Sequence, residues 1–496
     1  MVTRLVGVDP ATGKLPDVVL DNLNNRYNQR VIDTQYPSLE EALAATPTGG
    51  TLEVRSTWSR AIPFVVGKPC SVLFRGGGSI TTTTNSTTIQ VAADDVRIDA
   101  PRLAGTGSAS AGIGVAVSVG AYKRTEITRA KVTGYNKYGF YLEGATDFVL
   151  QSNDVSDIAY GGIMMVSCAT GVVQGNRVRN ITQPAGFLNS YGIAATRDSS
   201  KTITASPRSS QILITNNVVD GVPKWEGIDT HAGTEITISY NTVRNTNVGI
   251  ALVPGVGIDG NDLYGAQNCI VTCNVIDSTM SDGSRSSGIQ VVGAGVTLGS
   301  PIEASTGCSV TNNTIRRHGK EAGGANDGAI ALYYTSGIIV AQNSLIESGV
   351  RGIHLYHDNQ HGTITGNTFI DTWSDTVAYT AAVHVSSTFN SMSLSGNTVA
   401  RGSKTATKVN DRGLFVGTSA SNTISEGFND FDTCTTPVAD TGNVSTLRLR
   451  SKKVGAYGVT PVEQQTVSGA IGDGTALKSL LTALAAEGWI KNTTTS

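Results

Sequence analysis

Three neighbouring stretches decide the fold: ITNNVV at 214–219, ISYNTV at 238–243 and VTCNVI at 271–276. Each reads apolar, polar, any residue, asparagine, any residue, apolar. The same phrase recurs as LQSNDV (150–155), VQGNRV (173–178), VTNNTI (310–315), VAQNSL (340–345), ITGNTF (364–369) and LSGNTV (394–399). A second short apolar stretch, opened by glycine in most cases, follows each phrase. A unit that repeats every 20–50 residues or so is typical of a solenoid.

The spacing of the phrases indicates which solenoid. Successive asparagines lie 23 to 41 residues apart, and the shortest spacing gives the length of one coil. Extra residues enter only at turns, either before the glycine, as in 180–191, or after its strand, as in 254–268. Alternating Ile, Val and Leu send every second side chain inward, and stacked coils bury them in one column. The sequence therefore predicts an all-β chain folded as a right-handed parallel β-helix.

Individual positions in the repeat have expected roles. We expect the asparagine to adopt the left-handed turn conformation and its amide to hydrogen-bond between coils. We expect the glycine to permit a tight bend into the next strand. Asn-Gly hairpin signals, which would favour a propeller or a sandwich, are nearly absent. Cys269 and Cys308 fall at equivalent points of successive coils, where they are either buried thiols or a bridged pair.

Composition narrows the class of protein. The chain has 57 Gly among 496 residues, with 6% aromatic and 15% charged residues, which suits strands and turns. A net charge of −2 gives no sign of a nucleic-acid partner. The first residues lack the apolar segment of a signal peptide, and no window approaches the roughly 18 apolar residues that span a bilayer. We therefore expect synthesis in the cytoplasm without export by a signal peptide, and no membrane insertion.

Helical patterns occur near both ends of the chain. In the first, Ser38 can cap a helix with Glu41 three residues later, and Leu39, Ala42 and Leu43 form its apolar face. This helix is expected to close the open end of the solenoid.

The second pattern places an apolar stripe on a short helix, formed by Leu477, Leu480, Leu481, Leu484 and Ile490. So short a helix is not stable alone, so it either bundles with copies of itself or folds back on the β-helix.

Both ends carry a resemblance. A helix followed by P-x-G-G-T-φ-x-V and a run of coils resembles the opening of pectate-lyase-like β-helix proteins, including bacteriophage tailspikes. Residues 1–35 look like the particle-attachment leaders of phage tail proteins. The YG-x-TPV turn, glycine-rich link and helix of 452–490 resemble the module that closes many phage tail-fibre and tailspike proteins.

The resemblance implies a domain order and a setting. Residues 1–35 would be a leader that attaches to a phage tail or baseplate protein, 36–447 the β-helix, and 448–496 a trimerisation module. The chain would then be a homotrimeric component of the virion that binds bacterial surface polysaccharide. The alternatives are a polysaccharide depolymerase, either a hydrolase or a lyase, and a purely structural virion protein.

A group of outward-facing residues is the first candidate site. Residues two and four positions after each glycine should form one exposed column, with coils about 4.8 Å apart. Aromatic faces beside imidazoles suit the binding of sugar rings. The glycan-binding candidates are Tyr333, Tyr356, His357, Trp373 and His384. Exposed Tyr and His are also common on solenoid strands, so a plain surface is the alternative.

Catalytic candidates lie in the same region. Asp327 and Asp358 can serve as acid and base for glycoside hydrolysis, and His354 as the base of a lyase. The Gly-His-Gly and Arg-Ile-Lys motifs of polygalacturonases are absent, as is a row of Asp ligands like the calcium site of pectate lyases. No catalytic residue is therefore carried over, and we expect neither a metal nor a cofactor.

A second group, Trp225, Glu226, Asp229 and His231, lies about four coils away, or roughly 19 Å. It is either a separate subsite or surface, and it ranks below the first.

Overall fold

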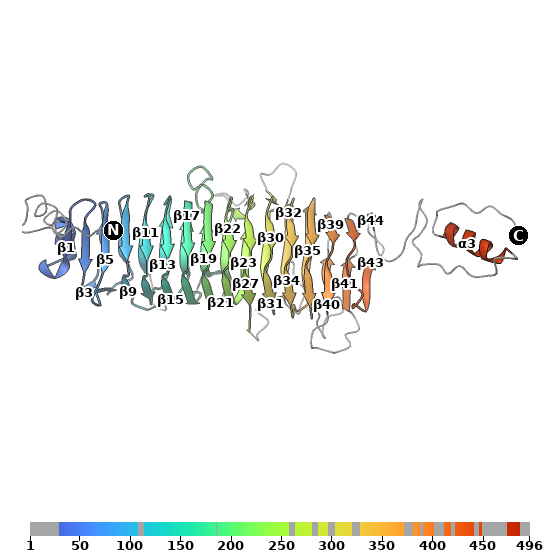
Figure 1. Ribbon diagram of the computed structural model, residues 1–496. Helices are drawn as coiled ribbons and strands as arrows, with labels where there is room; N and C mark the ends of the chain where they lie inside the picture. The colour runs from blue at the N-terminus through green and yellow to red at the C-terminus, as the bar shows by residue number, and fades with distance from the viewer. Residues whose placement is uncertain are drawn as a thin grey trace, which may run out of the picture.

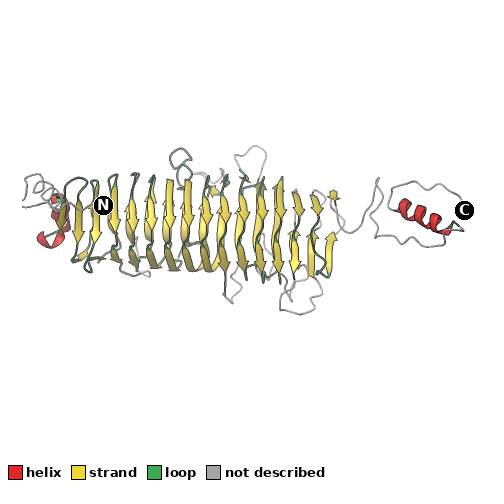
Figure 2. Cartoon of the chain, viewed as in Figure 1, coloured by secondary structure: helices red, strands yellow, loops and turns green. Residues whose placement is uncertain are grey.

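Short strands stacked along one long axis form the body of the computed structural model (Figure 1). Strands fill the stack, and within the described residues helix occurs only near the two ends of the chain (Figure 2). The described residues are 29–107, 114–184, 186–256, 263–279, 286–295, 303–319, 328–371, 380–386, 390–400, 411–417, 422–440, 446–448 and 474–486. Among them, all strand pairings are parallel except that of β24 (Gly255–Val256) with β25 (Leu263–Tyr264).

Each coil contributes strands to three sheets. The first sheet has 16 strands: β1 (Arg30–Ile32), β2 (Thr51–Val54), β5 (Cys70–Phe74), β8 (Val96–Asp99), β11 (Glu126–Thr128), β14 (Val149–Gln151), β17 (Ala169–Gln174), β20 (Ser210–Thr215), β22 (Thr237–Ser239), β26 (Ile270–Thr272), β30 (Ser309–Thr311), β33 (Ile339–Ala341), β36 (Gly362–Thr365), β39 (Ser391–Ser395), β42 (Thr423–Gly427) and β44 (Thr446–Arg448). The second sheet comprises β3 (Thr57–Arg60), β6 (Ser79–Thr82), β9 (Arg102–Ala104), β12 (Lys131–Thr133), β15 (Asp154–Ile158), β18 (Arg177–Ile181), β21 (Val218–His231), β23 (Thr242–Val253), β27 (Val275–Asp277), β31 (Thr314–Arg316), β34 (Ser344–Ile346), β37 (Thr368–Ile370) and β40 (Thr398–Ala400). The third sheet comprises β4 (Phe64–Val66), β7 (Thr87–Val91), β10 (Val115–Val119), β13 (Tyr138–Glu143), β16 (Gly161–Val166), β19 (Tyr191–Thr196), β28 (Ile289–Val292), β29 (Ser305–Thr306), β32 (Ile330–Ser336), β35 (Arg351–Gln360), β38 (Thr380–Val385), β41 (Asp411–Val416) and β43 (Thr436–Asp440). The long strands β21 and β23 run through both the second and the third sheet.

The apolar column of the repeat is confirmed. In the first sheet Leu150 aligns with Val173, then Ile214, Ile238 and Val271, and all five are fully buried. Because equivalent apolar residues stack in register, one continuous core runs through the coils. The prediction of an all-β parallel β-helix is therefore correct.

The asparagines of the repeat form a continuous ladder of side-chain amides. In it, Nδ2 of each residue donates to Oδ1 of the next at 2.8 to 3.0 Å. The members are Asn153, Asn176, Asn217, Asn241, Asn274, Asn313, Asn343, Asn367, Asn397 and Asn429. The expected left-handed conformation is wrong for the asparagine itself: the preceding residue adopts it, as in Ser152, Asn216 and Tyr240 with φ of 54° to 57°. That turn points the following amide inward, where it stacks.

The strand-opening glycines have a different role from the one expected. A Cβ on Gly192 would lie 2.3 Å from the carbonyl oxygen of Gly227, and one on Gly249 would lie 2.4 Å from that of Gly288. None of these four residues has a φ in the left-handed region. Glycine is needed here because successive coils approach each other too closely for a side chain, and not because the chain bends.

The N-terminal cap is as predicted. Helix α2 (Leu39–Ala45) begins after Ser38, whose Oγ accepts a hydrogen bond from the Glu41 amide at 3.2 Å. The first strand of the stack, β1, pairs with β2 and is followed by the 3-10 helix η1 (Asp33–Gln35). Buried Asp33 accepts a hydrogen bond from the Trp58 indole at 2.8 Å. The stack therefore starts within the last residues of the predicted leader, and residues 1–28 lie outside the described part.

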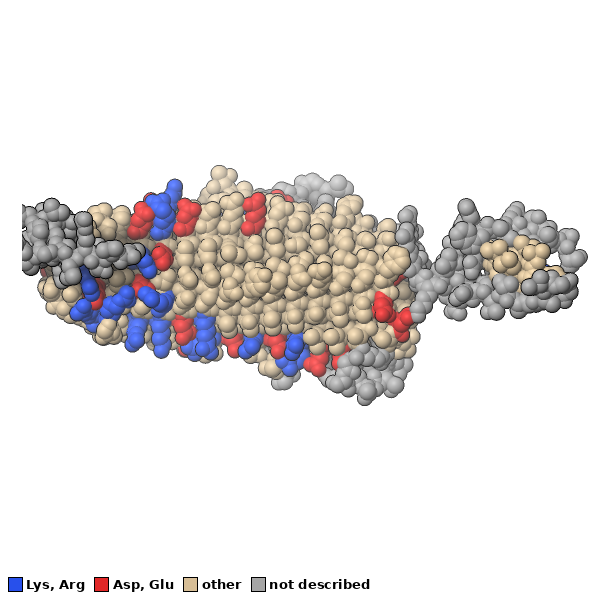
Figure 3. Space-filling model, viewed as in Figure 1, with Lys and Arg blue, Asp and Glu red and all other residues tan. Residues whose placement is uncertain are grey.

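A buried carboxylate supports the turn after β8. Asp99 accepts hydrogen bonds from Arg129 at 2.8 Å, Thr128 at 2.9 Å and Arg75 at 3.0 Å. Burial would raise the pKa of Asp99, but the bonds from Arg129, Thr128 and Arg75 outweigh it and lower the pKa to about 2. On the face in Figure 3, charges gather toward the N-terminal end and along the edges, and the middle carries few.

Two further predictions can be compared with the structure. Cys269 and Cys308 are buried, unbridged thiols. The predicted C-terminal helix is present as α3 (Thr475–Ala486), in which Leu477 and Leu480 are 60% and 41% exposed. Neither α2 nor α3, the α-helices of the described residues, is long and apolar enough to cross a bilayer. Ile490 and most of 448–496 lie outside the described residues, so trimerisation stays a prediction.

Candidate functional site

The structure brings together five of the sequence-predicted site residues on the third sheet. We call Tyr333, His354, Tyr356, His357 and His384 the histidine patch. His354 and His384 are direct neighbours on β35 and β38, with ring centroids 5.4 Å apart. The ring of Tyr356 lies 5.7 Å from His354 and 5.0 Å from Tyr333. The juxtaposition is as predicted, and its role in glycan binding stays a prediction.

The expectation that this column is exposed is wrong for its histidines. His354 and His384 are only 1% and 4% exposed, because the neighbouring rings cover them. Arg351 donates to His384 at 3.1 Å, and Ser386 Oγ lies 2.6 Å from His354 Nε2. These contacts are typical of a packed polar layer, which leaves little surface for a substrate at either imidazole.

The structure describes one of the two predicted catalytic carboxylates, Asp358. Asp358 follows His354 by four residues on β35, beyond a register shift in the pairing of β35 with β32. Its φ is 51°, and its carboxylate accepts a hydrogen bond from Gln360 at 2.9 Å. Asp327 and Trp373 lie outside the described residues. The proposed acid and base pair of Asp327 and Asp358 therefore stays a prediction.

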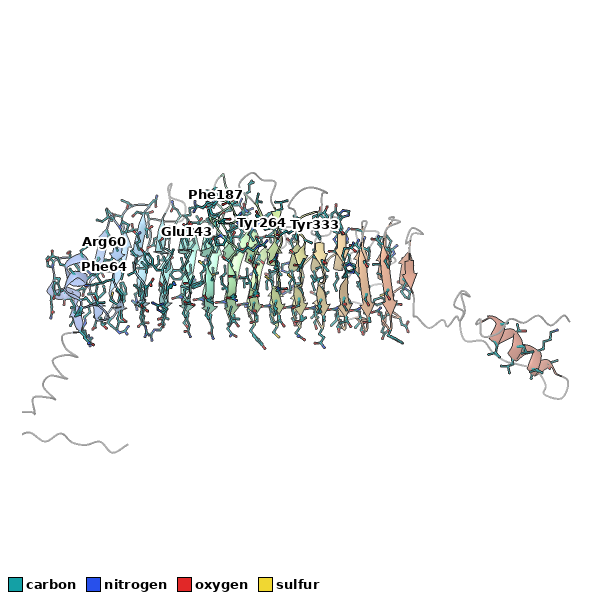
Figure 4. The ribbon with its side chains drawn as sticks, turned by 90° about the horizontal axis from the view of Figure 1, so that it is seen from above. Arg60, Phe64, Glu143, Phe187, Tyr264 and Tyr333 are labelled. Atoms are coloured by element: carbon teal, nitrogen blue, oxygen red, sulfur yellow. The ribbon has the colours of Figure 1, made fainter. Side chains whose placement is uncertain are left out.

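A cleft on the same flank of the stack is the stronger candidate. It has a volume of about 450 Å³, within the range of small-ligand sites. We call it the tyrosine cleft. Its lining includes Tyr138, Tyr141, Tyr160, Tyr191, Asn189, Arg197, Asp198 and His231. Figure 4 shows Glu143, Phe187, Tyr264 and Tyr333 along one edge of the stack, so the cleft and the histidine patch share that edge.

Its aromatic wall comes from successive coils. The rings of Tyr138 and Tyr141 are stacked with centroids 4.9 Å apart, and Tyr160 meets Tyr191 edge to face at 5.6 Å. Phe187 extends the wall at 4.8 Å from Tyr160. Rows of rings with exposed edges and faces suit planar, partly apolar ligands with hydroxyl rims. Sequence reasoning missed these residues, although Tyr stands directly before a strand-opening glycine at 138, 160 and 191.

Charged groups form the rim of the cleft. Lys201 bridges Glu143 at 2.8 Å and Asp198 at 3.1 Å. The Arg197 guanidinium donates to the carbonyl oxygens of Ser206 at 3.1 Å and Lys201 at 2.5 Å, which fixes the loop beside the cleft. Polar donors and acceptors therefore stand beside the aromatic wall, as a hydroxyl-rich ligand requires.

The second predicted group borders this cleft. Glu226, Asp229 and His231, which we call the buried trio, lie at the end of β21 where the strand enters the third sheet. The pairing of β21 with β23 shifts between Val222 and Glu226, and from Glu226 onward β21 aligns regularly with β19 and β23. One ligand atom from each residue lies within 4.8 Å of the other two, so the buried trio can hold a metal ion.

Burial controls the protonation of the buried trio. Burial and the nearby charge of Asp229 raise the pKa of Glu226 to about 8. Burial likewise raises the pKa of Asp229, although His231 partly opposes the shift. Burial would lower the pKa of His231, but the carboxylates of Asp229 and Glu226 outweigh it and raise the pKa to about 9. Perturbed groups of this kind beside a cleft are typical of functional sites.

Comparison with known proteins defines the fold further. A family model described as a right handed beta helix region matches residues 72–207 and 111–298. The fold is a right-handed parallel β-helix. A second family model, described as periplasmic copper-binding protein (NosD), matches residues 254–446. No curated protein matches this β-helix chain in sequence.

Solved structures share the β-helix fold at low identity. The pre-mature gene product 12 of bacteriophage phi29 is 12% identical, with a TM-score of 0.57 over 88% of this chain and 60% of that chain. The catalytic unit of a GH87 alpha-1,3-glucanase from Streptomyces thermodiastaticus is 14% identical, with a TM-score of 0.52 over 84% and 69%. The tailspike protein gp208 of Dettilon is 14% identical, with a TM-score of 0.46 over 85% and 70%. At these identities the similarity concerns the fold.

Proposed function

We propose that this β-helix is a phage tailspike or tail-fibre protein that binds a bacterial surface polysaccharide in the tyrosine cleft. The observation that carries the proposal is the wall of Tyr138, Tyr141, Tyr160 and Tyr191 beside a charged rim. Sugar rings present apolar faces to aromatic side chains and hydroxyl groups to polar ones. A cleft of about 450 Å³ accommodates a short run of sugar units and leaves the rest of a long chain outside.

The histidine patch is a second contact region on the same edge. Its half-buried tyrosines, Tyr333 and Tyr356, and half-buried His357 offer rings, while His354 and His384 are covered. A polysaccharide is long enough to follow the edge of the stack from the tyrosine cleft toward this patch. The cleft is then the main binding site and the patch a secondary one.

The virion setting completes the proposal. The chain shares its fold with phi29 gene product 12, a bacteriophage protein. In this setting residues 1–35 attach the chain to a phage tail or baseplate protein, and 448–496 hold three copies together. Leu477 and Leu480 of α3 are exposed in the single chain, and such an apolar stripe is buried when helices bundle. The copies would stand on the particle as a homotrimer and take part in adsorption to the host.

Depolymerisation is the second candidate function. The alpha-1,3-glucanase shows that the fold hosts a polysaccharide-cleaving enzyme. In this chain the carboxyl groups of Glu226 and Asp229 lie close together beside the tyrosine cleft, and two carboxyl groups are the usual apparatus of glycoside hydrolysis. Both carboxyl groups are buried, so this pair stands beside Asp327, Asp358 and His354 as a candidate and does not replace them. A purely structural virion protein, by contrast, would have no affinity for a glycan.

The test is incubation of the full chain with purified surface polysaccharides of candidate host bacteria, following both glycan retention and glycan size. We expect retention, and Tyr160→Ala should weaken it about tenfold, equivalent to some 1.4 kcal/mol of lost stacking. Tyr356→Ala should weaken it less, and Tyr122→Ala, outside the cleft lining, is the matched control. Shortened chains would establish the depolymerase. Absence of retention, or equal retention by Tyr160→Ala, would refute binding in the tyrosine cleft.

A further inference from the structure

We propose that the buried trio of Glu226, Asp229 and His231 binds one divalent cation, Zn²⁺, at the end of the tyrosine cleft that His231 lines. The proposal does not depend on the glycan, because all three ligands belong to one strand of this chain. It differs from the sequence-based expectation of no metal.

The first argument is the set of buried atoms without hydrogen-bond partners. Glu226 and Asp229 are 2% and 0% exposed. Oε2 of Glu226, both carboxylate oxygens of Asp229 and Nε2 of His231 have no hydrogen-bond partner. Buried polar atoms in proteins are almost always paired, and an ion is one of the few explanations when several unpaired atoms converge. Here four such atoms belong to three side chains that face one another.

The second argument is the orientation of His231. Its Nδ1 lies 3.3 Å from the carbonyl oxygen of Pro254. A carbonyl only accepts, so Nδ1 carries a proton, and Nε2 is the ring nitrogen that faces Asp229 and is left to bind an ion. Nε2 lies 3.0 Å from Asp229 Oδ2, but the two atoms are not aligned as a hydrogen bond. A histidine that donates one N–H to a backbone carbonyl and directs its other nitrogen at a carboxylate has the arrangement of a metal ligand.

The third argument is charge. With both carboxyl groups ionised and His231 neutral, as metal ligands are, the buried trio would present two negative charges to the ion. Asp229 aligns with Ala194 on β19 and with Ala251 on β23, so the neighbouring coils add no compensating charge at that position. Burying two uncompensated carboxylates is costly, and a divalent cation neutralises both.

The ligand set indicates the kind of ion. Imidazole nitrogen suits zinc and other transition metals, whereas calcium and magnesium prefer oxygen ligands alone. Bonds of about 2.0–2.2 Å from Zn²⁺ to nitrogen and oxygen place adjacent ligands roughly 3–3.5 Å apart. The 3.0 Å between His231 Nε2 and Asp229 Oδ2 fits that spacing. Three protein ligands also leave a coordination position for water or for a ligand in the cleft.

The test uses the full chain stripped with a chelator and titrated with Zn²⁺ against a chromophoric competitor, with elemental analysis for stoichiometry. We expect one Zn²⁺ per chain and a rise in Tm on binding. Asp229→Asn and Glu226→Gln keep the size of each side chain, and each should weaken Zn²⁺ binding at least 100-fold and abolish the Tm shift. His231→Gln, at a partly exposed position, gives a third variant should either of these fail to fold.

Two controls separate the site from unspecific binding and from the glycan proposal. Glu126→Gln removes an exposed carboxylate on β11 and should bind Zn²⁺ as the wild type does. Tyr160→Ala should retain Zn²⁺ even where it loses glycan. The proposal is wrong if the wild type binds less than one equivalent, if Asp229→Asn binds equally well, or if Glu126→Gln loses the ion. The proposal is also wrong if Asp229→Asn has a higher Tm than the wild type when both are metal-free and added Zn²⁺ does not raise the Tm of the wild type. In that case protons, and not a metal ion, neutralise the buried trio.

Discussion

Replacing one asparagine of the ladder, Asn176→Ala, should destabilise the β-helix strongly. The amide of Asn176 donates to the Leu150 carbonyl and to Asn217 Oδ1, both at 2.9 Å. Its Oδ1 accepts from the backbone N–H and the side-chain amide of Asn153, at 3.0 and 2.9 Å. Asn176 is 1% exposed, so water does not replace these bonds. Two buried donors that lose their acceptor cost about 1–3 kcal/mol each, which predicts a loss of about 2–6 kcal/mol.

The assay is guanidinium unfolding followed by far-UV circular dichroism, with the free energy of unfolding compared between variants. Gln151→Ala is the matched control, because Gln151 carries the same amide two residues before the ladder position of its own coil and is exposed. Its free energy of unfolding should change by no more than about 0.5 kcal/mol. If Asn176→Ala also changes it by less than about 1 kcal/mol, the ladder is not a major source of stability.

Three further predictions follow from the packing, the charges and the chain end. Gly249→Ala should lower the free energy of unfolding by about 1–3 kcal/mol, because the new Cβ would lie 2.4 Å from the Gly288 carbonyl oxygen. Gly67→Ala is the control, because a Cβ at Gly67 meets open space and should change the free energy of unfolding little. Equal losses for the two variants in thermal melts would contradict the close-approach argument. The depressed pKa of Asp99 contributes stability that is present above the unfolded pKa of about 3.9 and is lost as the pH falls toward 2. Between pH 5 and 2 the stability advantage of wild type over Asp99→Asn should shrink by about 1–2 kcal/mol, allowing for the exposure of the arginines, and a constant difference would exclude this contribution. Removing 452–496 should convert a trimer into monomers by light scattering, and a truncated chain that stays trimeric would refute the assigned role of α3.

Much of the candidate site could not be predicted from the sequence, because the pattern within one coil does not show which side chains of neighbouring coils will cover it. The alternation of side chains after each strand-opening glycine placed His354 and His384 on the outer side of their strands, which is correct. It did not reveal that neighbouring rings cover them, since burial on the outer side depends on adjacent coils. The same alternation placed Asp229 on the outer side of its strand. It did not predict that neighbouring parts of the chain cover Asp229 and bury it fully.

The sequence by itself determined the repeat, the inward apolar column, the asparagine ladder and the capping helix at Ser38. Each of these follows from spacing within one coil, which local chemistry fixes: alternation in strands, an amide at the turn, and a capping side chain. Only the tertiary structure decided where the site lies. The tyrosine cleft draws side chains from several coils, and the buried trio lies where the long strand β21 passes into the third sheet under the cover of neighbouring coils. Such lateral alignment is set by how coils of unequal length stack, and no periodicity along a single coil encodes it.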